Sequence, residues 1–253
     1  MRWALIGAST IARQYMIGAI RAERGDIVRV MSSSAERARD FAAQHAIPKS
    51  GADLQELLAD SDVDAVYIST TNEKHLPQAL AAVKAGKHVL CEKPLALTLD
   101  DATAMVRAAK EAGLVFATNH HLRCSGSHRA VRALITSGRI GRVLSLRLHH
   151  AVFLPPHLQG WRINSPDAGG GVIPDITVHD ADVARFLLGN LLYGQGRRQD
   201  ALARWREAIE RGLRDVVLLR NAGGPERDWM AGGWVWMAFV VTWFVDTGAY
   251  FAG

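Results

Sequence analysis

Over its first 119 residues the chain alternates short apolar runs with amphipathic segments, and this alternation restricts the possible fold more than any other feature. The apolar runs predict strands at 3–7, 27–31, 63–69, 89–91 and 115–118. The segments between them predict helices at about 11–21, 35–44, 53–59, 76–85 and 99–112. Strands that alternate with helices are typical of an α/β protein, so we expect a Rossmann-type doubly wound parallel sheet.

Composition excludes some classes of protein. The formal net charge of +5 is mild and the sequence has no Lys/Arg block, so we expect no nucleic-acid partner. Two cysteines, Cys91 and Cys124, form no disulfide framework, and Met1 leads directly into a strand without a signal-peptide pattern. We therefore expect a cytoplasmic location. The pairs His120-His121 and His149-His150 have no carboxylate or cysteine at ligand spacing, so we expect no metal site.

The first predicted strand runs into Gly7-Ala8-Ser9-Thr10-Ile11-Ala12 and then into a helix. This is the position of a dinucleotide-binding loop, where free N–H groups at a helix start face a phosphate. Only the first glycine of the G-x-G-x-x-G pattern is present, but Ser9 and Ala12 are small enough for close backbone approach. An ordinary strand-to-helix turn remains the alternative.

The second predicted strand is followed by Ser32-Ser33-Ser34, with Arg37 one turn further on. NAD-preferring sites carry an acidic residue here, which binds the ribose hydroxyls. Hydroxyls and an arginine would instead bind a 2′-phosphate, so we expect NADP(H) bound by Ser32, Ser33 and Arg37. Ser34 can also simply cap the helix 35–44, and the two interpretations are compatible.

A third candidate is Glu92-Lys93-Pro94, which follows the apolar run 89–91. Proline ends the strand, so Glu92 and Lys93 lie at its carboxyl end, where ligands bind in open α/β sheets. A lysine there can polarise a substrate oxygen. The alternative is a surface ion pair at a strand end.

Asp175 and His179 are four residues apart on a predicted helix, 175–188, and so share one face. A histidine held by a carboxylate can protonate the oxyanion that forms when hydride reaches a carbonyl. An ordinary i,i+4 pair is the alternative.

Three motifs together resemble the Gfo/Idh/MocA family of oxidoreductases: Gly7 to Ala12, Ser69-Thr70-Thr71-Asn72-Glu73-Lys74-His75, and Cys91-Glu92-Lys93-Pro94-Leu95-Ala96. The stretches 118–123, 154–162 and 175–180 are similar to one sugar reductase of that family, and the resemblance covers about 2–188. It implies NADP-dependent reduction of a small sugar-like ketone, with Lys93 polarising the carbonyl and His179, steadied by Asp175, donating the proton. The residues that it implies for the cofactor and substrate cleft, besides the loop and Arg37, are Thr70, Thr71, Asn72, His75, Glu92, Lys93, Asn119, Trp161 and Arg162.

We divide the chain into a nucleotide-binding domain (1–119), a truncated α+β substrate domain (120–189) with a helix at 128–136 and then a long strand at 143–153, and an unrelated tail (190–253). The tail predicts an amphipathic helix at 191–212 and an uncharged apolar segment at 229–245 that offers a membrane contact. Residues 244–253 resemble part of the phosphatidate cytidylyltransferases, which are membrane enzymes, but their downstream signature residues are absent. An NADP(H)-binding remnant without turnover, attached to a membrane through 229–245, is the second functional hypothesis.

Overall fold

The computed structural model describes residues 1–141, 143, 146–150, 156, 159–160, 164–165, 169 and 173–194. The chain forms two compact units: Met1–Asn119 with Gly160–Gly171, and His120–Gln159 with Val172–Gly253. The domain boundary expected after residue 119 coincides with the end of the first segment of the first unit.

The first unit is built on a six-stranded sheet with the order β3-β2-β1-β4-β5-β6. All of its strand pairs are parallel, and the order is that of a doubly wound nucleotide-binding fold, as predicted. The strands are β1 (Arg2–Ile6), β2 (Asp26–Met31), β3 (Lys49–Gly51), β4 (Ala65–Ile68), β5 (His88–Cys91) and β6 (Phe116–Thr118). The three-residue edge strand β3 was not predicted, because its residues lack an apolar run.

The helices of this unit begin and end close to the predicted residues. They are η1 (Ala12–Met16), α1 (Ile17–Ala22), α2 (Ala35–His45), α3 (Leu54–Ala59), η2 (Asn72–Lys74), α4 (His75–Lys84) and α5 (Leu99–Glu111). The predicted cap of α2 is confirmed, since the Ser34 side chain accepts a hydrogen bond from the Arg37 amide at 3.2 Å. Thr98 caps α5 in the same way.

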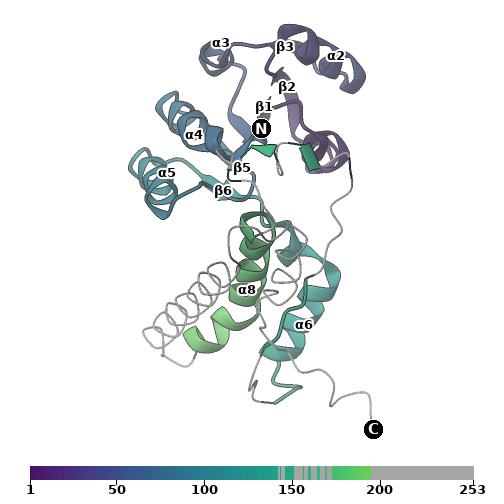
Figure 1. The fold of residues 1–253 in the computed structure, drawn as a ribbon, viewed down its shortest axis with the longest axis vertical. Coiled ribbons are helices and arrows are strands. Elements are labelled where there is room, and N and C mark those ends of the chain that lie inside the picture. The colour runs from purple at the N-terminus through teal and green to yellow at the C-terminus, as the bar shows by residue number, and fades with distance from the viewer. Residues whose placement is uncertain are drawn as a thin grey trace, which may run out of the picture. The chain divides into compact units, whose positions relative to one another are not determined.

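Two apolar clusters cover the two faces of the sheet. Because side chains alternate along a strand, Ala4 and Ile6 of β1 pack with α3, α4 and α5, whereas Leu5 packs with η1, α1 and α2. Figure 1 shows these two groups of helices on opposite sides of the strands. The nucleotide-binding unit therefore has a core on each face of its sheet, as a doubly wound fold requires.

The second unit contains η3 (His121–Cys124), α6 (Gly126–Thr136), η5 (Ile173–Thr177) and α8 (Val178–Gly194). Its apolar cluster joins Ile135 of α6 to Val183, Ala184 and Leu187 of α8. α8 continues without a break past residue 190, where the sequence analysis placed the start of the tail.

Several predictions fall largely or wholly outside the described residues. In the predicted strand at 143–153 the structure describes bridge residues at Arg147 and Leu148. The part of the tail beyond Gly194, with its apolar segment at 229–245, lies outside the described part of the chain. Within the part that is described, the helices are all too short or too polar to span a bilayer.

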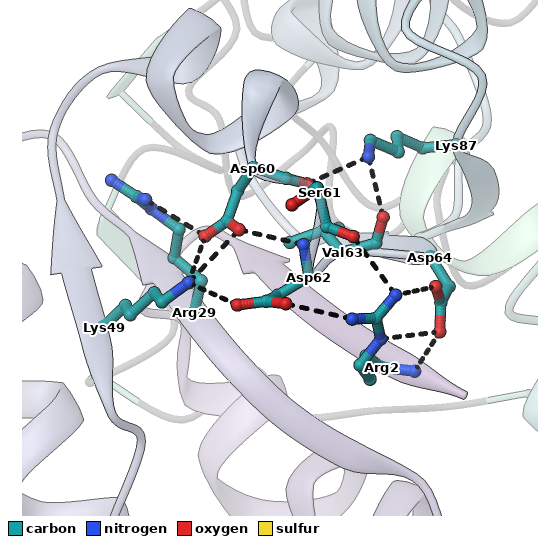
Figure 2. A network of polar contacts seen from close by, with 9 residues as sticks. All are labelled: Arg2, Arg29, Lys49, Asp60, Ser61, Asp62, Val63, Asp64 and Lys87. Carbon is teal, nitrogen blue, oxygen red and sulfur yellow. Dashed lines mark hydrogen bonds and ion pairs between the residues drawn. The ribbon is translucent and has the colours of Figure 1, made fainter.

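A network of charged side chains ties the loop before β4 to the neighbouring strands (Figure 2). Asp60 accepts hydrogen bonds from Lys49 at 2.9 Å and from Arg29 at 3.3 Å, and Arg29 is only 7% exposed. Lys87, directly before β5, donates to the carbonyl oxygens of Asp60 and Val63. The hydrogen bond from Lys49, then that from the Asp62 amide and that from Arg29, lower the pKa of Asp60 from 3.8 to about 2. The network therefore holds the loop to β2, β3 and the start of β5.

Replacing Asp60 by asparagine should lower the free energy of unfolding at pH 7 by about 2 kcal/mol, because the buried Arg29 loses a charged partner. The pKa of Asp60 is lower in the folded chain, so its contribution is complete above about pH 4 and disappears as the pH falls towards 2. Urea unfolding of both proteins at several pH values measures this difference. Asp62→Asn is the matched control, and because Asp62 is exposed its effect should stay below about 0.5 kcal/mol. Equal effects of the two substitutions would contradict the stabilising role assigned to the Asp60 carboxylate.

Candidate functional site

The candidate residues of the first unit lie in one row along the carboxyl edge of the sheet. The backbone hydrogen bonds of the sheet continue one residue beyond five of its strands. The Gly7 amide donates to Met31 at 2.9 Å, Ser32 to Gly51 at 3.2 Å, Ser69 to Ile6 at 2.9 Å, Glu92 to Ile68 at 2.9 Å and Asn119 to Cys91 at 2.8 Å. The glycine turn and the Glu-Lys-Pro turn are therefore fixed on the same edge, which is where open α/β sheets bind ligands.

The turn after β1 depends on Gly7, whose φ is +112°. A Cβ atom at this position would lie 3.0 Å from the Ser69 carbonyl oxygen, so only glycine fits between β1 and β4. Ser9 donates a hydrogen bond from its hydroxyl to that of Ser69 at 2.7 Å, and the Ser69 hydroxyl donates to the Gly7 carbonyl oxygen. The Ser9 hydroxyl also accepts from the Ala12 amide. Ser9, which stands where the G-x-G-x-x-G pattern has its second glycine, therefore links the loop to Ser69 and accepts a hydrogen bond from one of the N–H groups at the helix start.

A polar cavity of about 340 Å³ opens beside this loop, between the first helix and α2. It is lined by Ala8, Ser9, Thr10, Arg13, Ser34, Glu36, Arg37, Asp40, Phe41 and Gln44. Arg37 borders it and donates from its guanidinium to the Ala8 carbonyl oxygen at 3.0 Å. Ser32 and Ser33 are not among the lining residues, whereas Glu36 and Asp40 add carboxylates that sequence reasoning missed. The cavity, the arginine and the close-packed turn fit the nucleotide half of a dinucleotide.

The segment after β4 uses its polar side chains largely within the protein. Thr70 donates to Gln78 at 2.6 Å, Thr71 donates to Glu73, and Asn72 is buried. His75, expected in the cleft, is 0% exposed. Its Nδ1 lies 2.9 Å from the Pro94 carbonyl oxygen and its Nε2 3.2 Å from that of Thr70.

Burial lowers the pKa of His75, which favours the neutral ring. The neutral ring has one N–H, so His75 donates to one of these two carbonyl oxygens and lies against the other, between the turn after β4 and the Glu-Lys-Pro turn. This placement differs from the one expected, because both ring nitrogens lie against backbone carbonyl groups.

The Glu-Lys-Pro turn contains a buried carboxylate. Glu92 is only 6% exposed, so its side chain is not the surface group of the alternative interpretation. Its Oε1 accepts hydrogen bonds from the Tyr67 hydroxyl at 2.5 Å and from the side-chain amide of Asn119 at 2.6 Å. Its Oε2 accepts from the Lys93 backbone amide at 3.3 Å. The Lys93–Pro94 peptide bond is cis. Lys93 is thus held on a turn whose neighbouring carboxylate is anchored by two side chains.

In the second unit, histidine rings gather around the start of α8. His179 is buried, and its ring lies edge-on to those of His121 and His120, with centroids 5.0 and 6.2 Å away. Asp175 lies in η5, directly before α8, and its pairing with His179 stays a prediction. Trp161 and Arg162 lie outside the described residues.

A second histidine–carboxylate pair in this unit was missed by sequence reasoning. His150 Nδ1 lies 2.9 Å from Asp180, and the two residues are 30 positions apart, so no local spacing signals the contact. In the described part of the chain, no three His, Cys, Asp or Glu side chains form a group that could hold a metal ion.

The parallel sheet, the glycine-dependent turn and the cavity at the first helix define a dinucleotide-binding domain of the Rossmann type. Comparison with known families agrees. Residues 1–120 match the model described as an oxidoreductase family with an NAD-binding Rossmann fold, and residues 128–212 match the GFO/IDH/MocA C-terminal domain. The chain belongs to the Gfo/Idh/MocA family of oxidoreductases. The second match extends to residue 212, beyond residue 188, where the resemblance found in the sequence ended.

Individual relatives include sugar-converting enzymes. The 1,5-anhydro-D-fructose reductase of Ensifer adhaerens is 63% identical over 189 residues, which are 75% of this chain and 57% of that protein. A 3-ketoreductase from Actinomadura kijaniata, solved with NADP and TDP-benzene, is 30% identical with a TM-score of 0.65, over 74% of this chain and 57% of its own. A levoglucosan dehydrogenase, solved with NADH and levoglucosan, is 29% identical with a TM-score of 0.64, over 74% and 53%. The chain thus spans just over half the length of these relatives.

Gly7→Ala should weaken NADPH binding at least about tenfold and lower stability by about 1–3 kcal/mol, because the added methyl group meets the Ser69 backbone at a positive φ. Fluorescence titration with NADPH and thermal unfolding measure the two effects. Gly86→Ala is the matched control, since Gly86 also has a positive φ but open space around it. It should lose stability without losing NADPH affinity. Full NADPH affinity in Gly7→Ala would contradict the assignment of the loop.

Proposed function

We propose that the chain is an NADP-dependent reductase of a small sugar-like ketone, with 1,5-anhydro-D-fructose, reduced to 1,5-anhydro-D-mannitol, as the leading substrate. The observation that carries this proposal is the placement of the Lys93 turn on the same sheet edge as the Gly7 loop. The 63% identity to a 1,5-anhydro-D-fructose reductase supports the choice of substrate. A cytoplasmic location and a small-molecule partner belong to the same proposal.

The predicted catalytic residues have distinct tasks in this reaction. A nicotinamide cofactor, when bound, would supply the hydride. Lys93 donates a hydrogen bond to the substrate carbonyl oxygen and so favours the charge that develops there. His179, steadied by Asp175, gives its proton to the resulting alkoxide. The backbone from Ser9 to Ala12 faces the pyrophosphate, while Asn72, Trp161 and Arg162 contact the ligands.

The preference for NADP rests on the residues after β2. Ser32 stands where NAD-preferring sites carry a carboxylate, and Arg37 borders the cavity beside the glycine turn. An arginine can bind a 2′-phosphate through two parallel hydrogen bonds. Glu36 and Asp40 on the same cavity wall work against a phosphate, so the preference depends on the two arginines that line the cavity, Arg37 and Arg13.

The direct test of the reaction measures NADPH consumption with 1,5-anhydro-D-fructose and NADPH binding on the same sample of the full chain. We expect both turnover and binding. Binding without turnover would overturn the reductase proposal and favour the nucleotide-binding remnant.

Lys93→Met should lower kcat by about two orders of magnitude or more, since it removes the group that polarises the carbonyl. The Kd for NADPH should stay within about twofold, because the glycine loop and Arg37 are untouched. Steady-state kinetics and fluorescence titration measure the two quantities. Lys84→Met, on the exposed last turn of α4, is the matched control and should leave both unchanged. An unchanged kcat in Lys93→Met would remove Lys93 from the mechanism.

Arg37→Gln should weaken NADPH binding about tenfold or more and leave NADH binding within about twofold, because only NADPH carries the 2′-phosphate. Titration of each variant with both nucleotides measures the ratio. Arg39→Gln serves as control, since Arg39 lies on the same helix but does not border the cavity. An equal loss for both nucleotides in Arg37→Gln would contradict the proposed NADP preference.

A further inference from the structure

Tyr67 is a buried tyrosine to which the reaction described above gives no task. It lies within β4, where it pairs with Leu5 of β1 and Leu90 of β5. Its side chain is 0% exposed and belongs to the apolar cluster on the η1, α1 and α2 face. For packing alone, a phenylalanine would serve this position equally well, so the hydroxyl group needs its own explanation.

The hydroxyl group is directed at the catalytic turn. It donates to Glu92 Oε1 at 2.5 Å, and the same oxygen accepts from the Asn119 side chain at 2.6 Å. Burial, together with the neighbouring Glu92 carboxylate, raises the pKa of Tyr67 far above its ordinary value. Tyr67 therefore keeps its proton and donates it in the hydrogen bond to Glu92.

The two donors on Oε1 determine where the other carboxylate oxygen lies. Oε2 accepts from the Lys93 backbone amide at 3.3 Å, so the carboxylate links the interior of the sheet to the backbone of the lysine. Without the Tyr67 donor, the buried Oε1 would be held by the Asn119 side chain alone, and the carboxylate could then turn about that one contact. Any such turn would change its contact with the Lys93 amide.

We propose that Tyr67 is a positioning residue, whose hydroxyl holds the Glu92 carboxylate and through it the backbone of Lys93. The proposal rests on the proposed function, since it takes Lys93 as the group that polarises the substrate. Tyr67 itself lies in the core and touches neither substrate nor cofactor.

The kinetic test is Tyr67→Phe, which keeps the ring in the core and removes only the hydroxyl. We expect kcat to fall about tenfold, the size of one hydrogen bond to a charged group, with KM for NADPH within about twofold. Tyr15→Phe, at an exposed tyrosine, is the matched control and should keep the parent kcat. An unchanged kcat in Tyr67→Phe would overturn the proposal.

A double-mutant cycle tests whether the effect passes through Lys93. In the Lys93→Met background, Tyr67→Phe should lower the residual kcat by less than about twofold. The same tenfold loss in that background would overturn the proposal, because Tyr67 would then act independently of the lysine. If Tyr67→Phe does not fold, Glu92→Gln replaces it in both backgrounds. We again expect a tenfold loss of kcat in the parent and a loss of less than about twofold in the Lys93→Met background. An equal loss in both backgrounds would overturn the proposal.

A third measurement needs no turnover. In the NMR spectrum of protein labelled with ¹⁵N-lysine, the backbone amide signal of Lys93 is identified as the signal that disappears in Lys93→Met. This signal should shift in Tyr67→Phe and stay in place in Tyr15→Phe, because the amide bonds to Glu92. If the parent chain shows no turnover, the proposed function is wrong, but the shift of this signal still tests whether Tyr67 positions the Lys93 backbone. An unmoved Lys93 signal would overturn the proposal.

Discussion

The backbone hydrogen bonds of the parallel sheet, continued past the strand ends, are the constraint on which the candidate site of the first unit depends. The amides of Gly7, Ser32, Ser69, Glu92 and Asn119 each donate to the last carbonyl group of the neighbouring strand. Because those bonds fix the starting point of each turn, five separate chain segments begin within one row. The loop for the nucleotide and the turn with Lys93 are then brought together by the same ladder that forms the fold.

The polar groups before the strands and those at the carboxyl ends of the strands have different roles. Around the loop before β4, charged side chains from β2, β3 and the approach to β5 hold Asp60 and the adjacent backbone. At the carboxyl edge, the buried Glu92 and His75 face partners within the protein and hold the turn that carries Lys93. The first network stabilises the unit, whereas the second holds the turn of the residue that we propose as the one that polarises the substrate.

Much of the first unit could be predicted from the sequence. The strand at Arg2–Ile6, the cap at Ser34 and the helix that starts at Leu99 all follow from short local patterns. The edge strand β3 escaped prediction because its three residues are recruited by pairing with β2, not by an apolar pattern of their own. His75 was assigned to the cleft from a resemblance, but its ring is buried between two turns, a placement that depends on where Pro94 folds back.

The sequence by itself determined the class of fold, the family and the candidate residues Gly7 and Lys93, because alternation, a glycine at a strand end and a proline after it are local signals. Only the tertiary structure decided the partners of the buried polar groups. Tyr67 and Glu92 are 25 positions apart, Arg29 and Asp60 are 31 apart, and His150 and Asp180 are 30 apart. Such pairs form where strands and helices from separate segments meet, so no spacing along the chain reveals them.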